Sequence, residues 1–133
     1  MKGNLLIVDD ELDLLTNMKE LLEDEAHHIY LANNGEEGLA ILMSHQIDCV
    51  VSDIKMPVMD GLTFIKMARK LGLNMPFIFY TGHGSSELKK ITRDLGATDL
   101  FTKPNHFNLE IAIRNVLSAR LLTAVSTLEN FIR

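Results

Sequence analysis

Residues 49–61 read C-V-V-S-D-I-K-M-P-V-M-D-G, and this stretch decides the fold. It opens with the apolar run Cys49 to Val51, whose lack of polar alternation is typical of a strand buried on both faces. The carboxylate of Asp53 stands where the run ends, and a loop broken by Pro57 follows. A loop carboxylate or a helix cap explains an isolated acid here better than a reactive group does. The role of Asp53 therefore depends on the rest of the chain.

Short apolar runs alternate with helical patterns along the whole chain. Besides the run at 47–52, strands are predicted at 5–8, 29–32, 77–80 and 99–102. Apolar residues spaced by three and four positions predict a helix after each strand, with Asn34 and Ser85 as N-caps of the second and fourth helices. Gly38 lies inside the second helix and weakens it by roughly 1 kcal/mol relative to alanine. Five strand–helix units predict an α/β fold with a doubly wound parallel sheet.

The composition is that of an ordinary globular domain. The chain has 133 residues, of which 47% are apolar and 23% charged, and this suits one domain with a single core. The net charge of −5 argues against a nucleic-acid surface, which needs a basic face. No run of about 18 apolar residues predicts a membrane span, and the run at 5–8 is too short for a signal peptide. The single cysteine, Cys49, lies in a buried strand pattern, which indicates a reducing cytoplasm.

Four of the five predicted strands end in reactive side chains, which are Asp9 and Asp10, Asp53, Thr81 and Lys103. Ligands of open parallel sheets bind at the carboxyl ends of the strands. If the strand order is 2-1-3-4-5, the four ends are neighbours and the bare second strand lies at the sheet's outer edge. Asp9 and Asp10 alone could also cap the first helix, since acids favour a helix N-terminus.

The chemistry of this set follows from its charges. Three carboxylates close together do not all stay ionised without a cation, and Mg²⁺ prefers oxygen ligands and pairs with substrate phosphate. Carboxylates act as nucleophiles in aspartyl-phosphate chemistry. Mg²⁺ and Lys103 could stabilise the charge on a transferring phosphoryl group, and the Thr81 hydroxyl could bond one of its oxygens. The residues therefore predict a site at which Asp53 accepts a phosphoryl group.

Five short motifs carry a resemblance to a known family. They are I-V-D-D-E at 7–11, D-I-K-M-P-V-M-D-G at 53–61, T-G at 81–82, G-A at 96–97 and K-P at 103–104. In this order, and each at a strand end, they resemble the receiver domains of bacterial two-component response regulators over about residues 4–118. The resemblance implies a flavodoxin-like, doubly wound five-stranded parallel sheet of order 2-1-3-4-5. We expect a receiver domain over residues 1–118, and an extension of the last helix over 119–133.

The resemblance also implies roles for individual residues. Asp53 is the expected phosphoacceptor, and the donor is a phosphohistidine on a sensor histidine kinase or phosphotransfer protein. Thr81 is the expected switch hydroxyl, and Lys103 is expected to pair with the Asp53 carboxylate or its phosphate. The peptide bond between Lys103 and Pro104 is expected to be cis. The expected Mg²⁺ ligands are Asp10 and Asp53 directly, Asp9 through water, and the backbone carbonyl of Lys55. Such a protein is not a classical enzyme, and it signals to a downstream protein by contact.

Two positions bear on how the site is used. Family members commonly carry Tyr or Phe three residues before the lysine, where this chain has Leu100. Phe101 is next to it, but successive strand residues face opposite sides, so Phe101 is expected in the other layer. Lys55 and His83 lie two residues beyond Asp53 and Thr81, at the mouth of the site. We expect Lys55 to affect the rate of phosphate hydrolysis, and His83 to be a solvated loop residue.

The last helical pattern continues beyond the family's usual end. Apolar residues recur at three- and four-residue spacing through Phe131, and 109–132 could form one helix of roughly 36 Å. Its apolar stripe suggests a homodimer or partner contact. The alternatives are an extra helix that folds back on the domain and a linker to a further domain.

Other functions remain as alternatives. One is a phosphate-independent interaction module on the same fold, which Leu100 favours and the complete acid, hydroxyl and lysine set opposes. A Mg²⁺-dependent phosphohydrolase would need a general acid near Asp53, and none is evident. A flavodoxin-type carrier is disfavoured because the first loop is acidic and lacks a phosphate-binding glycine or hydroxyl run.

Overall fold

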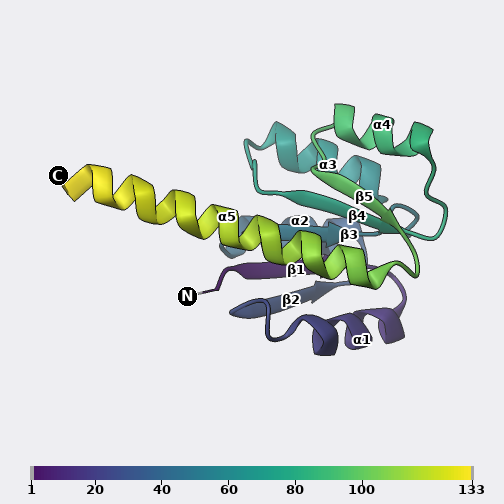
Figure 1. The fold of residues 1–133 in the computed structure, drawn as a ribbon. Helices are drawn as coiled ribbons and strands as arrows, with labels where there is room; N and C mark the ends of the chain where they lie inside the picture. The colour runs from purple at the N-terminus through teal and green to yellow at the C-terminus, as the bar shows by residue number, and fades with distance from the viewer. Residues whose placement is uncertain (1, 133) are drawn as a thin grey trace.

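The computed structural model describes residues 2–132, in which five parallel strands form one sheet in the order β2-β1-β3-β4-β5 (Figure 1). The predicted fold class and strand order are confirmed. The strands are β1 (Asn4–Val8), β2 (His28–Ala32), β3 (Cys49–Ser52), β4 (Phe77–Thr81) and β5 (Asp99–Thr102). The helices are α1 (Leu12–Leu22), α2 (Gly35–Ser44), α3 (Gly61–Lys70), α4 (Ser86–Asp94) and α5 (His106–Ile132).

The third strand is shorter than predicted. It begins at Cys49 rather than at residue 47, although Ile47 is buried. The preceding residue, Asp48, bonds the first residue of β1 instead, because its carboxylate accepts the Asn4 N–H at 2.8 Å. The Asp48 N–H donates to the Asn4 carbonyl, also at 2.8 Å. These two bonds join the residue before β3 to the first residue of β1, one position before the paired residues of the two strands begin.

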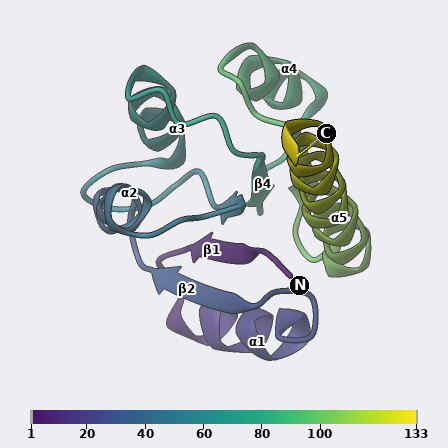
Figure 2. The ribbon, with the colours of Figure 1, turned by 90° about the vertical axis from the view of Figure 1, so that its left-hand side faces the viewer.

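The helices cover both faces of the sheet (Figure 2). One layer packs α2, α3 and α4 against inward-facing residues such as Val50, Phe77 and Phe79. The other packs α1 and α5 against Ile7, Val51 and neighbouring strand residues. Every residue of β3 and β4 is buried, as the unbroken apolar runs predict. Reactive side chains can therefore reach solvent only beyond the carboxyl ends of these two strands.

Side-chain caps start three of the helices. The side chains of Asn34, Asp60 and Ser85 accept the backbone N–H three residues further on, at the starts of α2, α3 and α4. Asn34 and Ser85 were predicted from sequence, and Asp60 was not. Helix α1 has Glu11 at its N-cap position with no side-chain cap bond, and the carboxylate of Asp9 accepts the Glu11 N–H just before the helix at 2.9 Å.

Gly38 has a packing role that the sequence did not reveal. It is buried where α2 approaches α3 and the sheet. A Cβ atom at this position would lie 2.8 Å from Phe64 Cζ and 3.1 Å from Val8 Cγ2. The glycine therefore permits a close approach of helix to core, which offsets its cost in helix propensity.

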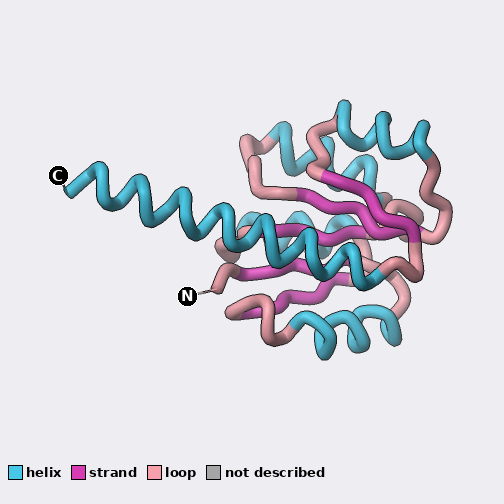
Figure 3. The backbone as a smooth tube through the Cα atoms, in the orientation of Figure 1, coloured by secondary structure: helices cyan, strands magenta, loops and turns pink. Residues whose placement is uncertain are grey.

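Helix α5 is one continuous helix that projects beyond the domain body (Figure 3). Leu109, Ile113 and Leu117 are buried against the sheet, whereas the residues after Leu117 are exposed apart from the half-buried Arg120. The alternative in which the tail folds back as an additional covering helix is therefore wrong. By length and mean hydropathy alone, which reaches 1.2 over an 18-residue window, α5 could also cross a membrane, and 11% of that window is buried within the protein.

Candidate functional site

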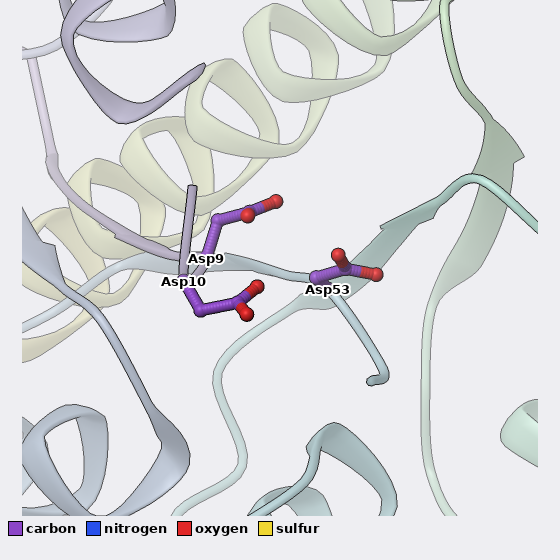
Figure 4. Close-up of side chains that lie close together, drawn as sticks. All are labelled: Asp9, Asp10 and Asp53. Atoms are coloured by element: carbon purple, nitrogen blue, oxygen red, sulfur yellow. The ribbon is translucent and has the colours of Figure 1, made fainter. Parts of the chain in front are cut away.

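Backbone hydrogen bonds place Asp9 and Asp53 at the carboxyl end of the sheet. The Asp9 N–H donates to the Ala32 carbonyl at 3.1 Å, and the Asp53 N–H donates to the Val8 carbonyl at 2.9 Å. These bonds continue the ladders of β1 by one residue on each side. The side chains of Asp9, Asp10 and Asp53 lie close together (Figure 4), and one carboxylate oxygen from each lies within 4.8 Å of the others. The structure thus brings together the three acids predicted from sequence.

Two of the acids are buried and fixed in orientation, and the third is open to solvent. Asp9 is 2% exposed and Asp53 is 8% exposed. One oxygen of Asp9 accepts the Glu11 N–H at 2.9 Å, and one oxygen of Asp53 accepts the Ile54 N–H at 2.7 Å. Asp10 is exposed. The remaining oxygens of the two buried acids are the ones directed at the shared space.

Lys103 bridges these two buried carboxylates. Its Nζ lies 2.8 Å from Asp9 Oδ2 and 3.1 Å from Asp53 Oδ2. The Lys103 N–H also donates to the Thr81 carbonyl at 2.8 Å, and the Lys103–Pro104 bond is cis, as the resemblance implied. A lysine from the end of β5 therefore reaches the acids that follow β1 and β3.

The pKa values reflect this arrangement. Burial would lower the pKa of Lys103, but the hydrogen bonds to Asp9 and Asp53 outweigh it and leave that pKa raised. Burial raises the pKa of Asp9, and the hydrogen bond from Lys103 offsets only part of this rise. In formal charges, two buried carboxylates face one lysine, which leaves this group negative.

Thr81 is buried at the end of β4, the strand beside β3. Its hydroxyl accepts the His83 N–H at 3.4 Å, which leaves the hydroxyl proton free to turn toward the site. Lys55 is exposed and lines an open hollow of about 420 Å³ together with Asp10. His83 is exposed in the loop after β4, as predicted.

Ser52 and Gly61 also shape the site, and sequence reasoning missed both. The fully buried Ser52 hydroxyl donates to the Asp53 carbonyl at 2.7 Å. A Cβ at Gly61 would lie 2.2 Å from that same carbonyl oxygen, so only glycine lets the loop return so closely. The signal for Ser52 was a hydroxyl inside an otherwise apolar strand.

The donor set suits a hard divalent cation. It offers carboxylate oxygens from three residues within a few ångströms, and excess negative charge favours a cation there. Mg²⁺ binds to proteins through one or two carboxylates and keeps several waters, which the open side at Asp10 can accommodate. The residues present therefore fit Mg²⁺.

Residues 5–114 match the family of response regulator receiver domains. This chain belongs to that family. Receiver domains are phosphorylation-gated signalling switches of two-component systems rather than classical enzymes. They bind Mg²⁺ at a cluster of acidic residues, and the cluster of Asp9, Asp10 and Asp53 is of that kind.

Named relatives agree with this assignment. The transcriptional regulatory protein DltR of Streptococcus agalactiae is 37% identical over 100 residues, which cover 75% of this receiver and 45% of DltR. The aerobic respiration control protein ArcA of Escherichia coli is 34% identical over 116 residues, which cover 86% of this receiver and 48% of ArcA. The chain thus spans about half the length of these curated relatives.

Solved receiver structures have the same fold. A CheY-like response regulator receiver domain protein from Methanospirillum hungatei superposes with a TM-score of 0.83 at 31% identity. The superposition covers 92% of this receiver and 99% of that chain.

The structure separates Leu100 from Phe101 as predicted. Leu100 is buried in the layer of α2, α3 and α4, opposite Phe79 in the strand register. Phe101 packs in the other layer, with α1 and α5. A Cβ at Gly84 would lie 2.1 Å from Thr102 Oγ1 and 3.2 Å from Leu100 Cδ2, so the loop after β4 passes close to both side chains. In this receiver an aliphatic side chain therefore supports the loop that follows Thr81.

Proposed function

We propose that this receiver accepts a phosphoryl group on Asp53 in a Mg²⁺-dependent reaction, loses it by hydrolysis, and signals by protein contact in the phosphorylated interval. The donor is a phosphohistidine of a sensor histidine kinase or phosphotransfer protein. The observation that carries the proposal is the position of Lys103, hydrogen-bonded to both Asp9 and Asp53 beside a third carboxylate. A lysine so placed both orients the acceptor and offers positive charge to an incoming phosphoryl group.

In the transfer step, a carboxylate oxygen of Asp53 forms a bond to phosphorus while the phosphorus–nitrogen bond of the donor breaks. The electron pair of that bond stays with the departing imidazole, and an acyl phosphate remains on Asp53. The Lys103 ammonium stabilises the negative charge on the transferring group, and the Thr81 hydroxyl donates to one of its oxygens.

For the metal, the proposed ligands are Asp10 and Asp53 directly, Asp9 through water, and the backbone carbonyl of Lys55. When bound, Mg²⁺ supplies charge neutralisation for the carboxylates and for the phosphoryl oxygens. The shared hollow of Asp10 and Lys55 supports the inclusion of Lys55, because both lie on the same open side of the site. For Lys55 we further expect an effect on phosphate lifetime, which an unchanged half-life in Lys55→Ala would contradict.

Partners and location are part of the same proposal. A net charge of −5 disfavours direct contact with nucleic acid or with an anionic membrane surface, so the downstream target is taken to be a protein. The buried free thiol of Cys49 suits the reducing cytoplasm. We assign residues 1–118 to the receiver domain and 119–133 to an extension of α5, and Met1 and Arg133 lie outside the described residues.

The test is phosphoryl uptake from acetyl phosphate, followed by intact mass. With Mg²⁺ present, we expect the mass to rise by one phosphoryl group, and with a chelator in place of Mg²⁺ we expect no rise. Asp94→Asn serves as a control, because Asp94 is an exposed acid at the end of α4 and lies outside both the three-acid cluster and the hollow. Absence of uptake under conditions that label another receiver would instead support the phosphate-independent interaction module, which Leu100 favours.

A further inference from the structure

Helix α5 carries an apolar side that nothing in the described part of the chain covers. Leu121, Val125, Leu128 and Ile132 follow one another at spacings of four, three and four residues, so they share one side of the helix. Their exposed fractions are 37%, 44%, 59% and 72%. Leu122 and Phe131 flank them and are 70% and 86% exposed. This side is called the apolar side of α5 below.

The apolar side continues along the domain body. Phe107 precedes Val125 by 18 residues, or five helical turns, and Ile111 precedes Leu122 by 11 residues, or three turns. Phe107 is 68% exposed and Ile111 is 36% exposed. The buried Leu117 precedes Leu128 by the same 11 residues, so in the extension the sheet-facing side of α5 merges with this exposed apolar surface.

The opposite side of residues 119–132 is polar and has weak helix formers. Thr123, Ser126 and Asn130 lie there, and the Thr123 hydroxyl donates back to the Ala119 carbonyl at 3.0 Å. A helix of this length with such residues is marginal in water unless an apolar face is buried. The extension therefore needs a partner surface for its own stability.

Charge decides between the possible occupants. Arg120 and Glu129 are the charged residues within 119–132, and their charges cancel. A helix that binds at an anionic lipid surface carries a basic polar face, which this extension lacks. A neutral segment has no like-charge repulsion with a copy of itself.

The available area indicates a weak pair. From Phe107 to Ile132 the apolar side is about 39 Å long, and a helix is about 10 Å wide. Two such strips together cover roughly 800 Å², which is below the 1,200–2,000 Å² of stable specific interfaces and in the range of weak, transient ones. A dimer of this size dissociates on dilution.

We propose that two copies of this chain pair through the apolar sides of their α5 helices, with residues 121–132 at the centre of the contact. The pairing goes beyond the phosphoryl chemistry and does not depend on it, because none of the acids of the site lies on α5. A chain with Asp53→Asn is therefore expected to dimerise like the wild type.

The first test measures molar mass by sedimentation equilibrium over a concentration series. We expect the mass of the wild type to rise toward that of two chains, and Val125→Glu with Leu128→Glu to remain monomeric. Thr123→Glu with Asn130→Glu is the matched control, with the same charge change on the polar side, and is expected to dimerise. A wild type that is monomeric throughout, or equal masses for the two variants, would overturn the proposal.

The second test is disulfide cross-linking at one introduced cysteine. The native Cys49 is fully buried, and burial raises the pKa of its thiol to about 12, so it stays silent in the folded protein. Val125→Cys is expected to form a covalent dimer under mild oxidation, several times faster than Thr123→Cys on the opposite side. Equal rates would contradict the pairing. So would a monomeric chain that sediments with phosphatidylcholine–phosphatidylglycerol vesicles, because lipid would then be the occupant.

Discussion

At the scale of single residues, Lys103 is the group on which the site depends. It donates to two buried carboxylates that otherwise repel one another, and its side chain is only 17% exposed. Charge-assisted hydrogen bonds in such surroundings are stronger than exposed ion pairs, because solvent screens them less. The lysine thus stabilises the fold of the resting receiver.

Replacing Lys103 by Met is expected to reduce the free energy of unfolding by about 2 kcal/mol without metal, because the carboxylates of Asp9 and Asp53 lose their counter-charge. Urea unfolding measures the change. Lys89→Met is the control, since Lys89 pairs with Asp99 at the surface at 3.2 Å and should cost less than about 1 kcal/mol. Equal costs for the two variants would show that Lys103 is not held as the structure indicates.

Residue identity was the part of the site most open to prediction. Asp9, Asp10, Asp53, Thr81 and Lys103 stand at strand ends, and parallel strands bring those ends to one edge. The supporting contacts were not predictable, because a polar residue inside an apolar strand does not by itself show which atom it will bond. The hydroxyl of Ser52 on the Asp53 carbonyl is one example.

At the scale of elements, helix α2 is tied to the core by Gly38. Gly38→Ala is expected to destabilise the protein by about 1–3 kcal/mol, because the overpacking against Phe64 and Val8 outweighs the gain in helix propensity. Thermal unfolding measures it. Asn17→Ala, on the exposed side of α1, is the control and should stabilise slightly. If Gly38→Ala were also stabilising, the close approach of α2 to α3 would not be a constraint.

Helix α5 is joined to the end of α1 by an ion pair that responds to pH. Arg114 donates twice to Glu25, both at 3.0 Å, and this hydrogen bonding lowers the pKa of Glu25. A carboxyl group whose pKa is lowered in the folded protein stabilises the fold at pH values above its ordinary pKa of 4.5. That stability is lost as the pH falls through the lowered pKa.

Glu25→Gln is therefore expected to lower Tm by at most a few degrees at pH 7, with a difference from wild type that shrinks in acid. Thermal unfolding of both proteins, from pH 7 down into the acid range, measures this difference in Tm. Glu20→Gln, an exposed change on α1, should show no such dependence. A difference that grew as pH fell would contradict the pairing.

At the scale of the whole molecule, the sequence pattern predicted the fold of the sheet and its helices, but it did not predict the course of α5 beyond the domain. Alternating strand and helix periods with short connections leave few arrangements other than a doubly wound sheet. The periodicity of α5 could not show whether its second half folds back, because an apolar stripe is the same in both cases. Only the structure shows Leu117 as the last residue of α5 buried against the domain.

The central claim concerns the whole molecule, since it requires groups from four strand ends to act together on Asp53. The most direct measurement locates the phosphoryl group after incubation with acetyl phosphate and Mg²⁺, by peptide mass mapping with and without hydroxylamine. Hydroxylamine cleaves an acyl phosphate and leaves phosphate esters of Ser or Thr intact. The account predicts one hydroxylamine-labile phosphoryl group on the peptide containing Asp53, and none in Asp53→Asn. A stable phosphate elsewhere, or undiminished labelling of Asp53→Asn, would contradict it.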